Sequence, residues 1–295
     1  MIRGFLALLI LASAMLAPLR AVQSGGGYVT TAPTVTNWSS GWPTAGKTGW
    51  DYVGQINGGA SAVYLGNGWV LTAGHVGSGI FNLAGVNYSN VAGSEHYLTT
   101  STGTGTATAD LTLFRISTSP PLYPLTLTSN PPTAFADAPP GDNAVIIGYG
   151  GGAGETWGQG SITYIDQLVA LDGTPFVSND FFVFYGSYSF SGSSFTNNAI
   201  LVGGDSGGGD FTYNSTTNTW ELAGINEVVG SGTMGTMGIT FSGMVQLNSY
   251  AAQINAIVNP PSSDTPTLPL PALFALAGLL LWAASRSLGK VRLSW

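Results

Sequence analysis

The sequence contains only two histidines, His75 and His96, so any chemistry that needs an imidazole must use one of them. Residues 69–76 run from an apolar stretch into small residues and end around His75. This pattern predicts a strand that finishes in a tight turn and presents the imidazole at its edge. His96 lies in a polar stretch without such support. We therefore interpret His75 as a candidate general base and assign no role to His96.

Ser206 is the candidate nucleophile. Glycines surround the pair Asp205-Ser206 within residues 203–209. Glycine accepts positive φ and leaves room for a substrate, and a tight turn frees backbone N–H groups for a developing oxyanion. A flexible loop is the alternative, because the chain has 43 glycines. The central Asp-Ser pair and the apolar run at 199–202 that leads into the loop favour the nucleophile.

The order of these residues along the chain selects among hydrolase families. The segment from Gly204 to Gly208 also fits the Gly-x-Ser-x-Gly pattern of α/β-hydrolases, but that fold needs a later histidine and none follows Ser206. An order that begins with aspartate could use Asp51, whose surroundings do not suit the role. The order His, Asp, Ser remains, and Asp110 completes it. Alone, Asp110 would be interpreted as a strand-capping residue; here its carboxylate, opening an apolar strand, can orient the imidazole.

Three segments, residues 69–76, 109–116 and 203–208, resemble the histidine, aspartate and serine motifs of the trypsin/chymotrypsin-like serine protease family, in the family's order. The similarity extends over roughly residues 50–258. The resemblance implies an all-β fold of two antiparallel β-barrels with a C-terminal helix. It also implies an active site in the cleft between the barrels.

The resemblance implies a role for each site residue. His75, Asp110 and Ser206 would form the catalytic triad, and the backbone N–H groups of Gly204 and Ser206 would form the oxyanion hole. Ser206 would be acylated while His75 moves the proton, and water would then hydrolyse the acyl-enzyme. No metal or other cofactor is expected, since no histidine and carboxylate spacing suggests a zinc site.

The resemblance also locates a substrate pocket and raises a question about Asp205. Ile200 falls at the floor of the family's primary pocket and Glu227 on a wall, and an apolar floor favours neutral or apolar side chains in the substrate. In the family, a freshly cut N-terminus commonly pairs with the aspartate before the serine, here Asp205. No matching activation sequence precedes Trp50, so the sequence identifies no partner for Asp205. Gly209 stands where the family usually has proline.

Composition narrows the function classes. Charged residues make up 7% of the chain and hydrophobic ones 44%, and short apolar runs broken by glycine, serine, threonine and asparagine favour a β-rich globule. Between Arg20 and Arg286 there are two basic residues against fourteen acidic ones, a net charge of −12. Such a surface repels phosphate backbones, so we expect no nucleic-acid partner. The absence of cysteine excludes disulfides and thiol catalysis.

The two ends of the chain indicate export. Residues 1–21 have a basic start, an apolar stretch and a possible cleavage site after Ala21, with a second possible site after Ala14. A retained anchor is the alternative. Near the C-terminus, a proline-rich lead, an apolar run and basic residues resemble a PEP-CTERM sorting tail, although Pro-Glu-Pro itself is absent. A plain membrane anchor is the alternative for this tail.

Between the ends, short strand-like runs and one helix, at residues 249–258, are expected. The expected strands are 61–65, 69–72, 110–116, 144–147, 161–171, 181–185, 220–225 and 238–247. Residues 99–108 are expected to be an exposed loop, and seven prolines make residues 119–140 a linker. The predicted organisation is: leader 1–21, N-terminal extension 22–49, first barrel 50–118, linker 119–140, second barrel with closing helix 141–258, and sorting or transmembrane tail 259–295.

The sequence therefore predicts a monomeric serine endopeptidase, exported and secreted or bound to the cell envelope of a bacterium. Its partners would be a protein or peptide substrate and, through the tail, membrane or envelope sorting machinery. A catalytically silent member of the fold, displayed as an adhesion or binding module, is the main alternative. A purely structural surface protein would leave the three motifs unexplained.

Overall fold

The computed structural model of the chain describes residues 22–24, 27–190, 192–234 and 237–260. The chain divides into two compact units, Met1–Val258 and Asn259–Trp295, and the fold below belongs to the first. The predicted leader and the predicted tail after residue 260 lie outside the described residues. Within the described part, no helix combines the length and the apolar character needed to cross a membrane.

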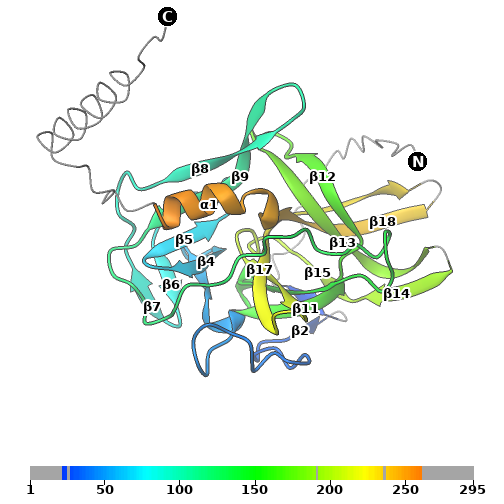
Figure 1. The fold of residues 1–295 in the computed structure, drawn as a ribbon, viewed down its shortest axis with the longest axis horizontal. Coiled ribbons are helices and arrows are strands. Elements are labelled where there is room, and N and C mark those ends of the chain that lie inside the picture. The colour runs from blue at the N-terminus through cyan, green and yellow to red at the C-terminus, as the bar shows by residue number, and fades with distance from the viewer. Residues whose placement is uncertain (1–21, 25–26, 191, 235–236, 261–295) are drawn as a thin grey trace, which may run out of the picture. The chain divides into compact units, whose positions relative to one another are not determined.

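The first part of the fold is a seven-stranded antiparallel sheet, with the strand order β7-β6-β3-β4-β5-β9-β8 (Figure 1). Turns with positive φ at two successive residues connect its short strands. One example is Asn67-Gly68, with φ of 54° and 78°. Such two-residue turns match the twist of the strands that they join. The strands are β3 (Val53–Ile56), β4 (Ala60–Gly66), β5 (Trp69–Thr72), β6 (Phe81–Leu83), β7 (Val86–Tyr88), β8 (His96–Ser101) and β9 (Thr106–Arg115).

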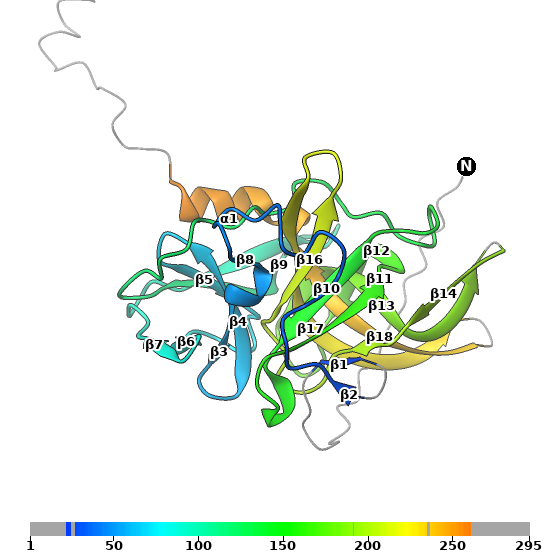
Figure 2. The same ribbon diagram turned by 90° about the horizontal axis from the view of Figure 1, so that it is seen from below.

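A second antiparallel sheet has eight strands in the order β11-β10-β16-β17-β18-β13-β12, with β14 paired to β13 (Figure 2). Its members include three long strands that form the larger hairpins. The strands are β10 (Asn143–Gly148), β11 (Thr156–Ser161), β12 (Tyr164–Ala170), β13 (Val177–Phe190), β14 (Ser193–Asn197), β16 (Gly209–Asn214), β17 (Thr219–Met234) and β18 (Met237–Gln246).

Short elements complete the first unit. A small sheet joins the beginning of the described chain to its later part, because β1 (Gln23–Ser24) pairs with both β2 (Gly27–Tyr28) and β15 (Ala199–Ile200). The remaining elements are the helical turns η1 (Gly49–Asp51), η2 (Gly150–Gly152) and η3 (Leu247–Ser249) and the helix α1 (Ala251–Val258).

The main hydrophobic core joins the two large sheets. Its fully buried members include Leu71 and Leu113 from the first sheet and Val145 and Ile225 from the second. Burying side chains of this size contributes on the order of 1.5–3 kcal/mol each, so the shared core holds the sheets against each other. The loops that leave both sheets can therefore supply residues to one site.

The predicted all-β class is confirmed: the described residues form antiparallel sheets with one α-helix, which lies at their C-terminal end. The sheets are open, however, rather than closed barrels, since neither strand order returns to its first strand. No helix or strand lies between β9 and β10, the region of the predicted linker, although an isolated bridge joins Leu127 to Leu222. The predicted division into domains stays a prediction.

Several local predictions need correction. Residues 99–108, predicted to be a loop, are the tip of the β8–β9 hairpin: residues 102–105 connect the strands, but 99–101 and 106–108 are paired strand, which their β-branched threonines suit. His96 begins β8 instead of lying in a loop, and Asp110 lies inside β9 instead of opening it. The predicted strand 161–171 is interrupted between β11 and β12. The predicted helix begins as η3 and continues as α1.

Candidate active site

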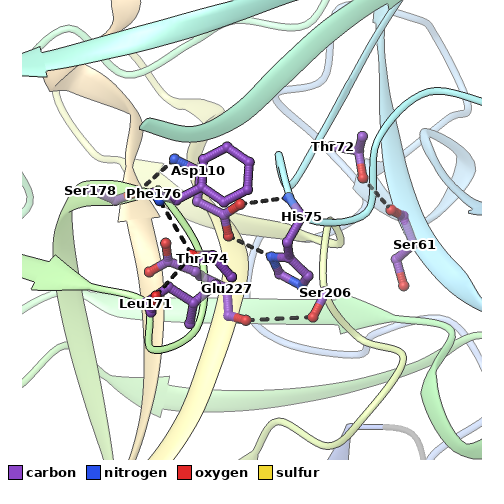
Figure 3. A network of polar contacts seen from close by, with 10 residues as sticks. All are labelled: Ser61, Thr72, His75, Asp110, Leu171, Thr174, Phe176, Ser178, Ser206 and Glu227. Atoms are coloured by element: carbon purple, nitrogen blue, oxygen red, sulfur yellow. Dashed lines mark hydrogen bonds and ion pairs between the residues drawn. The ribbon is translucent and has the colours of Figure 1, made fainter. Parts of the chain in front are cut away.

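Two hydrogen bonds join His75 to Asp110. β5 ends at Thr72, and the following turn carries His75 beyond the strand. The backbone N–H of His75 donates to Oδ1 of Asp110 at 2.7 Å, and the ring Nδ1 lies 2.6 Å from Oδ2 (Figure 3). When Nδ1 carries the proton, this contact holds the ring in the tautomer whose Nε2 can accept one.

The carboxylate and the imidazole differ in exposure. The Asp110 side chain is fully buried, whereas 27% of the His75 side chain is exposed. The backbone N–H of Asp110 donates to the hydroxyl of Ser178 at 2.9 Å, which ties β9 to β13 beside the carboxylate. The geometry therefore keeps the orienting group away from water and leaves the proton-accepting group accessible.

Ser206 lies in a tight turn before β16. The N–H of Gly208 donates to the carbonyl of Asp205 at 2.9 Å, and Ser61 donates its N–H to the carbonyl of Ser206 at the same distance. Gly207 has φ +87°, and a Cβ at this position would lie 2.1 Å from the carbonyl oxygen of Ser61. Only glycine fits this turn without displacing the first sheet.

The hydroxyl of Ser206 does not bond to the imidazole. Among the hydrogen bonds of the described residues, none joins Ser206 to His75, and Oγ of Ser206 instead donates to the carbonyl of Glu227 at 3.4 Å. That distance makes a weak bond. In Figure 3, Ser206 is drawn on the side of His75 away from Asp110. Catalytic hydrogen bonds are often long in substrate-free enzymes and tighten only in the complex.

Two backbone donors are free beside the serine. The N–H groups of Gly204 and Ser206 donate to no acceptor within the described part of the chain. The carbonyl of Gly204 accepts a bond from the Ser61 hydroxyl at 3.0 Å, which attaches this residue to the first sheet. Free, fixed N–H groups are what stabilises a developing oxyanion.

Asp205 has a partner that sequence reasoning missed. Its buried carboxylate accepts hydrogen bonds from the backbone N–H groups of Val202, Gly150 and Val22. Burial raises the pKa of Asp205 to about 7 against the opposing effect of these bonds. Val22 is fully buried and directly follows the predicted leader, so the predicted cleavage site after Ala21 was the available signal.

The two predicted pocket residues occupy different environments. Ile200 lies half-buried in β15, where it pairs with Gln23 of β1. The side chain of Glu227 is only 4% exposed, and its carboxyl faces Asp180 and Asp110. Their assignment to a substrate pocket stays a prediction. No local pattern in the sequence indicated the contact between Glu227 and Asp180.

A profile of the trypsin-like peptidase domain matches residues 60–225, which is more than half of the chain. The chain therefore belongs to the trypsin-like peptidase family and is a serine-type peptidase in class. No curated protein matches the sequence.

Similar solved structures include the inactive form of Rv3671c protease, with 17% identity, coverage of 71% of this chain and 90% of the other, and a TM-score of 0.45. The MamO protease domain from Magnetospirillum magneticum, in its apo form, has 17% identity, coverage of 70% and 96%, and a TM-score of 0.43. The HtrA-type protease AlgW with decapeptide has 20% identity, coverage of 68% and 51%, and a TM-score of 0.40.

Proposed function

We propose that the protein is an exported serine endopeptidase that cleaves peptide bonds through Ser206, His75 and Asp110. The observation that carries the proposal is the pair of short hydrogen bonds from His75 to the buried Asp110 carboxylate. An imidazole held in this way has one tautomer and one orientation, which a general base requires. The glycine-rich turn beside this imidazole leaves the N–H groups of Gly204 and Ser206 without acceptors in the described part of the chain, which supports Ser206 as the nucleophile.

In the proposed reaction, Nε2 of His75 takes the hydroxyl proton as Oγ of Ser206 attacks the substrate carbonyl carbon. The N–H groups of Gly204 and Ser206 stabilise the resulting oxyanion. The intermediate collapses to an acyl-enzyme when the His75 imidazolium gives its proton to the leaving amine. Water then attacks the ester by the same steps in reverse order and releases the acid.

The attack requires the Ser206 hydroxyl to leave the Glu227 carbonyl and turn to His75. The bond that must break is long, at 3.4 Å, so its loss costs little. Rotation about one side-chain torsion changes the direction of the hydroxyl without moving the turn. The same bond is also the observation that favours the alternative, a silent module of the fold that binds partners without cleaving them.

The proposal includes export and maturation. Cleavage of the leader after Ala21 would turn the backbone N–H of Val22 into an α-ammonium group at the place where it already bonds to Asp205. An opposite charge at this distance favours the ionised carboxylate, whose pKa would then fall. The tail beyond residue 258 would direct the protein to sorting machinery or hold it at the membrane.

Labelling by a fluorophosphonate probe tests the function. We expect the mature protein to be labelled on Ser206, and neither Ser206→Ala nor His75→Ala to be labelled. Circular dichroism of the variants controls for folding. A folded mature protein that resists the probe, with Val22 confirmed as its first residue, would establish the silent module instead.

A further inference from the structure

Three buried carboxyl groups, each from a different strand, lie close together beside the proposed triad. Asp110 belongs to β9, Asp180 to β13 and Glu227 to β17, and their exposed fractions are 0%, 0% and 4%. The carboxyl of Glu227 faces both of the others. Burying one unpaired carboxylate is costly, and burying three together is more so.

No lysine or arginine of the described chain neutralises this cluster, and the bonds of the His75 imidazole go to Asp110 rather than to Asp180 or Glu227. The described residues include two lysine or arginine side chains. Lys47 pairs with Asp51 at 2.9 Å, and the guanidinium of Arg115 lies over the Trp69 ring. The negative charges near Asp110 must therefore be reduced in another way.

The hydrogen bonds show which of the three carboxyl groups lack donors. Both oxygens of Asp110 are bonded, one to the N–H and one to the ring of His75. No donor of the described residues reaches the four carboxyl oxygens of Asp180 and Glu227 in ordinary hydrogen-bond geometry, although the Ser178 hydroxyl interacts with Glu227. These two carboxyls nevertheless lie against each other. An ionised carboxylate only accepts, so two ionised ones in contact would repel, whereas one proton between them makes a strong O–H···O⁻ bond.

Glu227 also contacts both ends of the proposed triad. Its backbone carbonyl accepts the hydroxyl of Ser206. Its carboxyl faces the hydroxyl of Ser178, which in turn accepts the N–H of Asp110 at 2.9 Å. Movement of Glu227 would therefore change the position of both the Ser206 hydroxyl and the Asp110 carboxylate.

We propose that Asp180 and Glu227 share one proton and that this bonded pair is a positioning unit, which holds Glu227 in the place that the Ser206, His75 and Asp110 site requires. The inference rests on the proposed function, because it assigns the pair to the same reaction. In this role the two carboxyls act by holding Glu227 in place and not by contact with the reacting atoms. Loss of the shared proton puts a second negative charge beside Asp110, and the repulsion is relieved by moving Glu227.

The pKa values of the pair indicate the pH range in which the shared proton is lost. Burial raises the pKa of Asp180 to about 7 and that of Glu227 well above its usual range. The groups that face the pair are the Asp110 carboxylate and the hydroxyls of Ser178 and Tyr250, and none of them brings a positive charge. The shared proton is therefore present in acid and neutral solution and is lost at alkaline pH.

The pH profile of Ser206 labelling by a fluorophosphonate tests the proposal. In the wild type we expect the labelling rate to fall on the alkaline side. In Asp180→Asn, the amide donates permanently to Glu227, so the fall in labelling rate moves to higher pH by one unit or more. At a pH where labelling of the wild type has declined, the variant should therefore be labelled about tenfold faster. Glu227→Gln should behave in the same way and serves if Asp180→Asn fails to fold.

A matched control distinguishes this pair from other buried acids. Glu155 is a half-buried acid whose pKa desolvation raises to about 9, but it bonds to the hydroxyl of Tyr149 at 2.9 Å rather than facing Asp110. Glu155→Gln should leave the alkaline fall where it is in the wild type. Coincident profiles for the wild type, Asp180→Asn and Glu227→Gln would overturn the proposal.

A second measurement separates this inference from the proposed function. In the Ser206→Ala background, the melting temperature should fall as pH rises from about 7 into the alkaline range, where the pair loses its shared proton, and adding Asp180→Asn should reduce that fall. If no protein is labelled but this pH dependence holds, the peptidase function fails and the shared proton stands. If labelling succeeds but Asp180→Asn changes neither measurement, the inference alone fails.

Discussion

The hydroxyl of Ser61, in the first sheet, donates a hydrogen bond to the carbonyl of Gly204 in the nucleophile turn, at 3.0 Å and across 143 positions of sequence. The same hydroxyl accepts the N–H of Tyr149 at 2.8 Å. Ser61 is fully buried, so water cannot replace it in either bond. One side chain thus connects the first sheet, the end of β10 and Gly204, the residue whose N–H would supply an oxyanion donor.

Ser61→Ala should weaken both stability and labelling. Without the Ser61 hydroxyl, the Gly204 carbonyl and the Tyr149 N–H lose a partner, which should lower the free energy of unfolding by about 1–3 kcal/mol. A displaced Gly204 peptide should slow fluorophosphonate labelling by about ten- to a hundredfold. Urea unfolding and labelling kinetics measure the two effects. Ser40→Ala, which removes an exposed hydroxyl bonded within its own turn, should change the unfolding free energy by less than about 0.5 kcal/mol.

Asp110→Asn should leave the fold intact and remove most of the activity. An amide in this place favours the wrong tautomer of His75, a change that costs about 10⁴-fold in turnover in enzymes of this kind. The labelling rate of Ser206 reports the loss, and circular dichroism checks the fold. The exposed Asp172 provides the control, because Asp172→Asn touches no part of the site. Equal labelling of Asp110→Asn and the wild type would contradict the triad.

Gly207→Ala tests whether the turn requires its backbone conformation. The residue has φ +87°, and the added methyl group would lie 2.1 Å from both the Ser61 carbonyl and the Thr72 hydroxyl. We expect a loss of about 2 kcal/mol or more in unfolding free energy, with labelling abolished. Gly105 has open space around the position of a Cβ, so Gly105→Ala should be nearly neutral in both measurements.

Much of this architecture could be predicted because its signals are local. The residue types and order of His75, Asp110 and Ser206, and most strands, follow from short runs of sequence. The contact between Asp180 and Glu227 could not be predicted, since it joins β13 and β17 across the sheet and neither residue has a distinctive neighbourhood. The sequence predicted a loop at residues 99–108, the threonine-rich tip of the β8–β9 hairpin, because polar β-branched residues suit both settings.

The first residue of the mature chain should control stability. A protein that begins at Val22 has an ammonium group beside Asp205, whereas one that begins at Ala21 displaces the charge by one residue, about 3.8 Å. Without the ammonium, the Asp205 pKa of about 7 exceeds its unfolded value, so stability is lost as pH rises through 7. We expect the Val22 form to melt at a higher temperature at pH 8. Asp205→Asn should remove the difference, and identical melting of the two Asp205 proteins would refute the pairing.

Glu155→Gln should stabilise the protein in alkaline and neutral solution. Burial raises the pKa of Glu155 to about 9, far above the unfolded value of 4.5. The stability that the protonated acid provides is complete below pH 4.5 and is lost as the pH rises towards 9. An amide keeps an acceptor for the Tyr149 hydroxyl without a charge. Melting temperatures at pH 5 and pH 8 should therefore differ less in the variant than in the wild type.

The pairing of β1 with β15 has a consequence for when the enzyme can form. Gln23 lies opposite Ile200, so the start of the described chain can complete the entrance to the turn that carries Ser206 only after at least 200 of the 295 residues have been synthesised. Contacts between such distant segments form slowly and late in folding. A chain still emerging from the ribosome or the membrane would thus have no finished nucleophile turn, and the producing cell would be protected from its own peptidase by the order of assembly.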